Sequence, residues 1–320
     1  MKVLVTGAEG FVGPYLMRAL ERAGHEVCGT SLDGAVGHRL DLLEEGSVQQ
    51  VIDELEPDAL AHLAAVSAVP AAAKNPQLTW RVNVDGVRSL TSALAAARPD
   101  ARILFVSSGA VYGSTSGNRP IEEHHATDPG NSYAWSKVAA EAWLKLQILS
   151  DRKPAWPRTM IARPFNHIGP GQGPEFALSG FARQIAEGEK TLVESKRSAP
   201  ISISTGNLEA RRDFLDVRDV VSAYVSLLES PTASGVFNIC SGESHRVGDL
   251  LDRLCALTPH ETTVVTSQDR MRACDRDGVL ASSARLRQET DWTPTHELSD
   301  TLEQILDDWR QRVGSPVGAD

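Results

Sequence analysis

Two residues that could together move a proton, Tyr133 and Lys137, stand four positions apart in a stretch of helical character. In an α-helix of about 3.6 residues per turn, positions four apart lie on neighbouring turns of one face. A tyrosine hydroxyl, with an ordinary pKa of about 10, is a poor acid or base at neutral pH, but a nearby cation lowers that pKa. The pair could therefore form an acid/base group. Because the same spacing also arises by chance on helix surfaces, its meaning depends on the residues upstream.

A third polar residue, Ser108, follows a short apolar run at residues 101–107 that has the composition of a buried strand. In a doubly wound parallel sheet, a hydroxyl at the carboxyl end of a strand points into the ligand crevice. A serine in this place often does no more than cap the following turn. Combined with Tyr133 and Lys137, it completes a candidate catalytic set of Ser108, Tyr133 and Lys137.

A glycine-rich turn at residues 7–13 directly follows the first apolar run and opens a helical pattern. Glycine there permits a tight turn, close approach of a pyrophosphate and close helix–strand packing, and the helix N-terminus offers amide hydrogens to the phosphates. This strand–turn–helix context predicts dinucleotide binding, although the glycine spacing differs from that of ordinary dehydrogenases. The predicted cofactor contacts in the turn are Gly7, Gly10, Phe11, Val12 and Gly13.

The end of the second predicted strand bears on the choice of cofactor. An acidic residue there would bond the adenosine ribose and favour NAD, but the position holds Ser31. A hydroxyl leaves room for a 2′-phosphate, and the nearest arginine is Arg39. We therefore expect NADP, with NAD possible. Asp41 and Leu42 end the next short strand and could meet the adenine amine, or Asp41 could only precede a helix.

The elements that must position these residues follow an alternating pattern. Short apolar runs predict strands near residues 2–6, 26–30, 38–41, 58–64, 101–107 and 159–164, and helical patterns lie near 11–23, 47–55, 75–97 and 131–150. This alternation is typical of an α/β protein with a doubly wound parallel (Rossmann) sheet.

The character of the chain changes after residue 165. Glycine and proline interrupt regular structure, residues 195–210 are polar, and a helix near 214–229 returns to the main domain. We therefore predict a smaller, discontinuous C-terminal substrate domain. Residues 1–165 and about 211–237 would form the dinucleotide-binding domain, and residues 166–210 and 238–314 the substrate domain.

Composition excludes several classes of protein. The 320 residues include 32 Lys and Arg against 42 Asp and Glu, a formal net charge of −10, which argues against nucleic acid or an anionic membrane as partner. No apolar run approaches the roughly 18 residues of a membrane span, and no signal sequence precedes the first strand, so we expect a cytoplasmic protein. The four cysteines lack metal-binding spacing and the His124–His125 pair lacks a third ligand, so no metal site is predicted.

These motifs resemble the extended short-chain dehydrogenase/reductase family, in particular its nucleotide-sugar branch. The segments that carry the resemblance are residues 7–13, 62–65, 83–86 and 163–166, with the serine, tyrosine and lysine set. It implies that Ser108 orients a carbonyl or hydroxyl, that Tyr133 is the acid/base, and that Lys137 holds the nicotinamide ribose and lowers the tyrosine pKa. It also implies cofactor contacts from Leu63, Ala64, Ala65, Asn83, Tyr133, Lys137, Pro164 and His167.

Residues 165–172 and 206–220 resemble the enzymes of GDP-6-deoxyhexose synthesis. The likeness implies substrate contacts from Ser107, Ser108 and Asn166. It further implies that Arg212 and Arg272 pair with the diphosphate, which suits a fork of charge-assisted donors. Arg212 could instead pair with a neighbouring aspartate.

The resemblance implies reduction by NAD(P)H of the C4 keto group of GDP-4-keto-6-deoxy-D-mannose to GDP-D-rhamnose or its C4 epimer. A nucleotide-sugar 4-epimerase, a GDP-mannose 4,6-dehydratase-like enzyme and a catalytically silent cofactor sensor are the alternatives. Dehydratases of this branch carry an acidic residue after the catalytic hydroxyl, whereas this chain has Gly109 and Ala110, which cannot move a proton. A homodimer is also expected, through the helices near 75–97 and 131–150.

Overall fold

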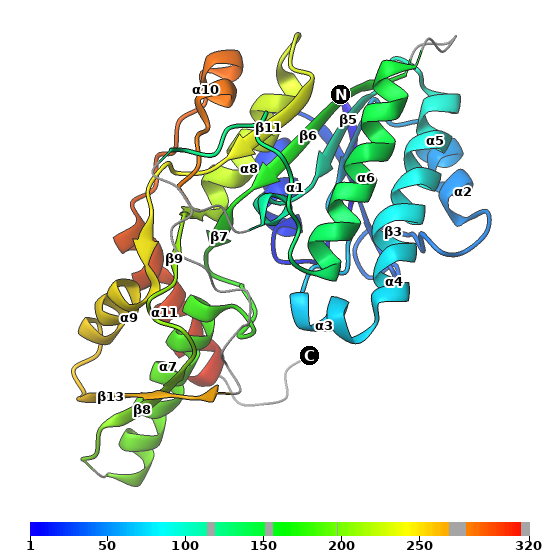
Figure 1. The fold of residues 1–320 in the computed structure, drawn as a ribbon. Helices are drawn as coiled ribbons and strands as arrows, with labels where there is room; N and C mark the ends of the chain where they lie inside the picture. The colour runs from blue at the N-terminus through cyan, green and yellow to red at the C-terminus, as the bar shows by residue number, and fades with distance from the viewer. Residues whose placement is uncertain (114–118, 151–155, 197, 269–279, 315–320) are drawn as a thin grey trace.

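A seven-stranded parallel sheet forms the centre of the protein, which we describe from a computed structural model for residues 1–113, 119–150, 156–196, 198–268 and 280–314 (Figure 1). The strand order is β11-β6-β5-β4-β1-β2-β3. The strands are β1 (Lys2–Thr6), β2 (Glu26–Ser31), β3 (His38–Arg39), β4 (Ala59–His62), β5 (Arg102–Val106), β6 (Arg158–Pro164) and β11 (Gly235–Ile239). The predicted Rossmann-type α/β fold is confirmed.

Helices cover both faces of this sheet because successive side chains of a buried strand point to opposite sides. In β1, Val3 and Val5 pack with α1 (Gly13–Arg22) and α8 (Val217–Glu229). Leu4 packs on the other face with α2 (Ser47–Leu55) and α5 (Val87–Ala97). On that second face, α6 (Ser132–Leu149) lies beside α5 (Figure 1).

The predicted helix at 75–97 is divided in the structure. It consists of α4 (Pro76–Trp80), a wider π-helical turn at Arg81–Gly86 and then α5, and a short helix α3 (Val69–Lys74) precedes it. Asn75 caps α4 by accepting a hydrogen bond from the amide of Leu78 at 3.1 Å. Such π turns frequently mark functional sites, and this one carries Asn83.

The remaining elements form a smaller region with its own apolar cluster. It contains β7 (Asn166–Ile168), α7 (Ala177–Ser195), β8 (Ile201–Thr205), β9 (Arg211–Arg212), β10 (Phe214–Asp216), β12 (His245–Arg246), α9 (Val247–Ala256), β13 (Thr262–Thr266) and α11 (Leu298–Gly314). The polar stretch near 195–210 includes β8, which pairs in parallel with β13.

Two elements that lie wholly or partly within the predicted substrate segment 238–314 pack with the main sheet. Strand β11 adds an edge strand that ends at Ile239, and α10 (Ala284–Thr290) packs against β11 and α8. The predicted division into two domains stays a prediction. Across the described residues, no helix combines the length and apolar character that a membrane span requires.

Candidate active site

A cavity of about 1200 Å³ lies along the carboxyl ends of the sheet strands. Because parallel strands all end at one edge, their terminal residues meet there although they lie far apart in the sequence. Among the described residues, every predicted site residue except Asn83 lines this cavity. Arg272 lies outside the described residues. The fold therefore brings the candidate catalytic set, the glycine turn and the predicted substrate contacts to one place.

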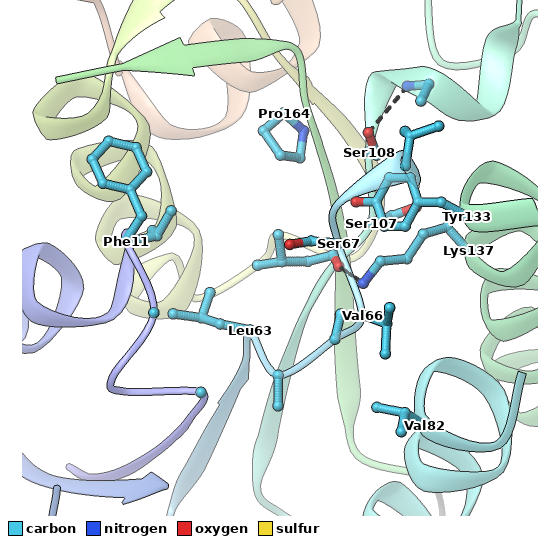
Figure 2. Close-up of a pocket in the computed structure, with 18 of the residues that line it drawn as sticks. Phe11, Leu63, Val66, Ser67, Val82, Ser107, Ser108, Tyr133, Lys137 and Pro164 are labelled. Carbon is cyan, nitrogen blue, oxygen red and sulfur yellow. Dashed lines mark hydrogen bonds between the residues drawn. The ribbon is translucent and has the colours of Figure 1, made fainter. Parts of the chain in front are cut away.

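The serine, tyrosine and lysine meet on one side of this cavity, opposite Phe11 and Leu63 (Figure 2). Asn131 caps the start of α6 by accepting from the amide of Ala134 at 2.9 Å, which sets the helix face that carries Tyr133. The Ser108 hydroxyl accepts from the amide of Ala110 at 3.1 Å, and its side chain is near enough to Tyr133 to affect the pKa of the phenol. Lys137 Nζ donates to the carbonyl oxygen of Val106 at 2.8 Å.

The protonation of these groups differs from the expectation. The pKa of Tyr133 is raised, not lowered as predicted, because burial penalises the phenolate more than the hydrogen bond from Ser108 stabilises it. Burial also lowers the pKa of Lys137 to about 7, against the opposing charge of Glu141. In the ligand-free protein, Tyr133 therefore stays protonated at neutral pH, whereas Lys137 titrates in the neutral range.

A buried ion pair lies directly behind the catalytic set, and the sequence reasoning missed it. Glu141 follows Lys137 by one helical turn and accepts from Arg163 Nε at 2.9 Å and Nη2 at 2.5 Å. Burial opposes ionisation of Glu141, but Arg163 and Lys145 hold its pKa below the usual value. The Ser107 hydroxyl donates to the same carboxylate at 2.6 Å, so it is committed to the protein and not turned to a substrate.

The glycines of residues 7–13 line the cavity, and two of them sit so close to neighbouring backbone that a side chain would clash. Gly7 has a left-handed backbone (φ +70°), and a Cβ there would lie 2.8 Å from the amide nitrogen of Ala64. A Cβ at Gly13 would clash with the carbonyl of Ala8, so α1 packs closely on β1. Phe11 stacks on His167 with 5.9 Å between ring centroids, which joins the turn to β7. These features fit a bound dinucleotide.

Strand pairing places Arg39 beside Ser31, at the end of β2 where the adenosine of a dinucleotide is expected. Strands β2 and β3 pair so that Ser31 lies opposite Arg39. The Ser31 hydroxyl accepts from the amide of Val36 at 3.0 Å and donates to Asp33 at 3.1 Å. Arg39 forms a 2.6 Å ion pair with Glu44 and keeps an exposed side chain.

Asp41 and Asn83 both have structural partners. Asp41 accepts from the amide of Leu43 at 2.8 Å, so it shapes the turn before α2 while also lining the cavity. Asn83 is fully buried; its Oδ1 accepts from the amide of Val66 at 2.8 Å, and its Nδ2 donates to Ser136 at 2.9 Å. Asn83 therefore supports the loop after β4 and the start of α6. It is not among the residues that line the cavity, and its contact with the cofactor stays a prediction.

The substrate end of the cavity is formed by the loop after β6 and by β9. Asn166 Nδ2 donates to the carbonyl of Asp213 at 3.0 Å, and Arg212 lines the cavity. Sequence reasoning assigned no contact to several further lining residues, namely Ser67, Gln172, Gly173 and Phe176, and it favoured a solvated loop position for Glu175, which also lines the cavity. The glycine- and proline-rich run after Ile168 was the available signal, because such loops at strand ends often carry ligand contacts.

Within the described ranges, no group of three or more His, Cys, Asp or Glu side chains could hold a metal ion.

A dinucleotide cradle and a Ser–Tyr–Lys set that share one cavity define an NAD(P)-dependent oxidoreductase-type enzyme. The chain belongs to the NAD dependent epimerase/dehydratase family, whose model matches residues 3–240. The resemblance to extended short-chain dehydrogenases/reductases is confirmed.

Individual relatives cover nearly the whole chain. It is 38% identical to the GDP-6-deoxy-D-mannose reductase of Pseudomonas aeruginosa over 98% of each chain. It is 27% identical to the GDP-6-deoxy-D-talose 4-dehydrogenase of Aggregatibacter actinomycetemcomitans, over 89% of this chain and 90% of that one. The solved structure of RMD from Pseudomonas aeruginosa complexed with NADPH superimposes with a TM-score of 0.84 and 37% identity, covering 97% of this chain and 99% of that one.

Proposed function

We propose that this protein catalyses NADPH-dependent reduction of the C4 keto group of GDP-4-keto-6-deoxy-D-mannose to GDP-D-rhamnose. The observation that carries the proposal is the 38% identity, over 98% of both chains, to a GDP-6-deoxy-D-mannose reductase. The catalytic geometry supports it, since Ser108 and Tyr133 line the same cavity as the buried Lys137. Gly109 and Ala110 after Ser108 offer no acid for dehydration.

The reduced dinucleotide supplies a hydride when bound. Tyr133 donates its proton to the C4 oxygen, and the raised pKa of this phenol keeps it in the protonated form that a reduction needs. Ser108 orients the same oxygen through its hydroxyl. Lys137, protonated, stabilises the phenolate left after transfer, and Asn166 and Arg212 would bind the sugar diphosphate.

A substrate panel tests this proposal. GDP-, dTDP- and UDP-linked 4-keto-6-deoxy sugars are each offered with NADPH and with NADH, and products are identified by NMR. We expect NADPH oxidation with GDP-4-keto-6-deoxy-D-mannose and GDP-D-rhamnose as product. GDP-6-deoxy-D-talose would show hydride delivery to the opposite face. Epimerisation of a nucleotide sugar without added reductant, and no oxidation of NADPH by the GDP-linked ketone, would contradict the proposal.

Arg39 supports the preference for NADP within this proposal. It lies opposite Ser31 in the sheet, and its exposed guanidinium, now paired with Glu44, is the kind of group that binds a 2′-phosphate. Arg39→Ala is expected to weaken NADPH binding about tenfold and NADH binding by less than twofold, because a charge-assisted contact is lost only for the phosphate. Fluorescence titration of both cofactors measures this. Arg88→Ala, an exposed arginine paired with Asp85, is the control, and equal losses for both cofactors would refute the role of Arg39.

A homodimer through α4, α5 and α6 also belongs to the proposal. Large apolar side chains are exposed on α4 and on one stripe of α6, namely Trp80, Trp135, Leu146 and Leu149. Leu146→Lys should convert the dimer to a monomer, because it places a charge in the buried contact. Analytical ultracentrifugation measures this, with Val193→Lys on α7 as an equally apolar, exposed control. A monomeric wild-type protein would contradict the proposed interface.

A further inference from the structure

Tyr224, in the middle of α8, has a buried hydroxyl without a partner. Its side chain is completely buried, and no hydrogen bond to the hydroxyl exists among the residues that the structure describes. Leaving a buried hydroxyl unsatisfied costs free energy, so native proteins seldom retain one. A phenylalanine would fill the same space without that cost. The hydroxyl therefore needs a partner that the described residues do not provide.

The position of Tyr224 indicates where that partner lies. Tyr224 contributes to the wall of the cofactor cavity, as do Val106, Tyr133 and Pro164. Its pKa is raised by burial and additionally by the charge that Tyr133 would carry, so the two phenols are close enough to interact. Helices α6 and α8 cover opposite faces of the sheet (Figure 1). The two phenols thus approach the carboxyl edge from opposite sides.

A nicotinamide ring bound in this cavity would have the chemistry to meet both groups. The ring must lie beside Tyr133, because the atom that accepts the hydride is bonded to the oxygen that Tyr133 protonates. The polar substituent of this ring is its carboxamide, which has both an acceptor oxygen and donor hydrogens. A tyrosine hydroxyl can donate to the one and accept from the other.

We infer that the Tyr224 hydroxyl hydrogen-bonds the carboxamide of the bound nicotinamide and so holds the ring beside Tyr133. This inference rests on NAD(P) binding and not on the identity of the sugar nucleotide. It assigns to α8 a direct contact with the reactive end of the cofactor. It also explains why the buried phenol has no hydrogen-bond partner among the residues that the structure describes.

Binding measurements on Tyr224→Phe test the inference without any sugar substrate. Two ligand pairs are titrated by calorimetry: NADP⁺ with 2′-phospho-ADP-ribose, and NAD⁺ with ADP-ribose. Each pair differs by the nicotinamide ring. We expect the affinity for the intact dinucleotide to fall about fivefold, the size of one neutral hydrogen bond, and the affinity for the ring-free ligand to change by less than twofold. The melting temperature of the ligand-free variant should stay the same or rise, since no internal bond is lost.

Tyr112→Phe is the matched control. Tyr112 is also buried, but its hydroxyl donates to Asn238 at 2.7 Å and lies outside the cavity lining. Tyr112→Phe should be less stable than the wild type. Its affinity for the intact dinucleotide, divided by its affinity for the ring-free ligand, should equal the wild-type ratio. The inference would be overturned if Tyr224→Phe bound the intact dinucleotide and the ring-free ligand with equally reduced affinity, or if it bound both as tightly as the wild type. A protein that reduces no ketone would contradict the proposed function. The binding comparison would still test the role of Tyr224, because it uses no sugar substrate.

Discussion

Tyr133→Phe is expected to lower kcat for ketone reduction by about 10²- to 10⁴-fold, the usual contribution of a positioned general acid. The phenyl ring keeps the shape of the cavity wall, so dinucleotide affinity should change by less than about threefold. The loss follows because the substitution removes the phenol hydroxyl that is proposed to protonate the C4 oxygen. Steady-state rates of NADPH oxidation and calorimetric cofactor binding measure the two effects separately.

The control for this substitution is Tyr15→Phe. The hydroxyl of Tyr15 donates to the carbonyl of Pro170 at 2.7 Å and not to a substrate. The kcat of Tyr15→Phe should remain within a few-fold of wild type. A Tyr133→Phe protein that kept most of its turnover would remove Tyr133 from the acid role. Loss of cofactor binding together with turnover would show a folding defect, which circular dichroism of the variant identifies.

Glu141→Gln is expected to lower the free energy of unfolding by about 3–5 kcal/mol, because it leaves the buried guanidinium of Arg163 without its counter-charge. Urea-induced unfolding measures this loss. Lys145→Met is the matched control: Lys145 also pairs with Glu141, but it is partly exposed, so its loss should cost less than about 1 kcal/mol. The double variant Glu141→Gln/Arg163→Met should regain part of the stability. A single variant as stable as wild type would refute the structural role of the pair.

The same variant should also change the pH dependence of the reaction. Glu141 raises the pKa of Lys137, which burial has lowered to about 7. Without the carboxylate, that pKa falls further and the protonated lysine is lost at lower pH. The decline of kcat on the alkaline side should therefore begin at a lower pH in Glu141→Gln than in the wild type. Unchanged pH profiles would limit Glu141 to a purely structural role.

Lys137 also ties stability to pH. Its folded-state pKa of about 7 lies below the ordinary lysine value of about 10.4, so the unfolded chain binds more protons between these values. The contribution of Lys137 to stability therefore rises as pH increases through this window. In plots of the free energy of unfolding against pH, Lys137→Met should lack the part of the slope that Lys137 contributes.

The sequence by itself determined the features that depend on neighbouring positions. A short apolar strand, a glycine turn and a helix follow one another directly, so the cradle at residues 7–13 was predictable. The spacing of Tyr133 and Lys137 placed both on one helix face for the same reason. Ser108 was predictable from the rule that parallel strands present their carboxyl ends to the ligand.

The tertiary structure alone decided the features that depend on register and burial. Arg39 became a neighbour of Ser31 through strand pairing, although eight positions separate them in the chain. Local spacing likewise could not show that Glu141 would meet Arg163 from β6, or that Tyr224 would reach the cavity from the opposite face of the sheet.

The pKa of Tyr133 was predicted with the wrong sign for the same physical reason. A nearby lysine is visible in the sequence, but the desolvation that raises the pKa arises only when many distant segments pack around the phenol. Local patterns therefore identified which residues do the chemistry, and packing between distant segments set their protonation and their supporting contacts.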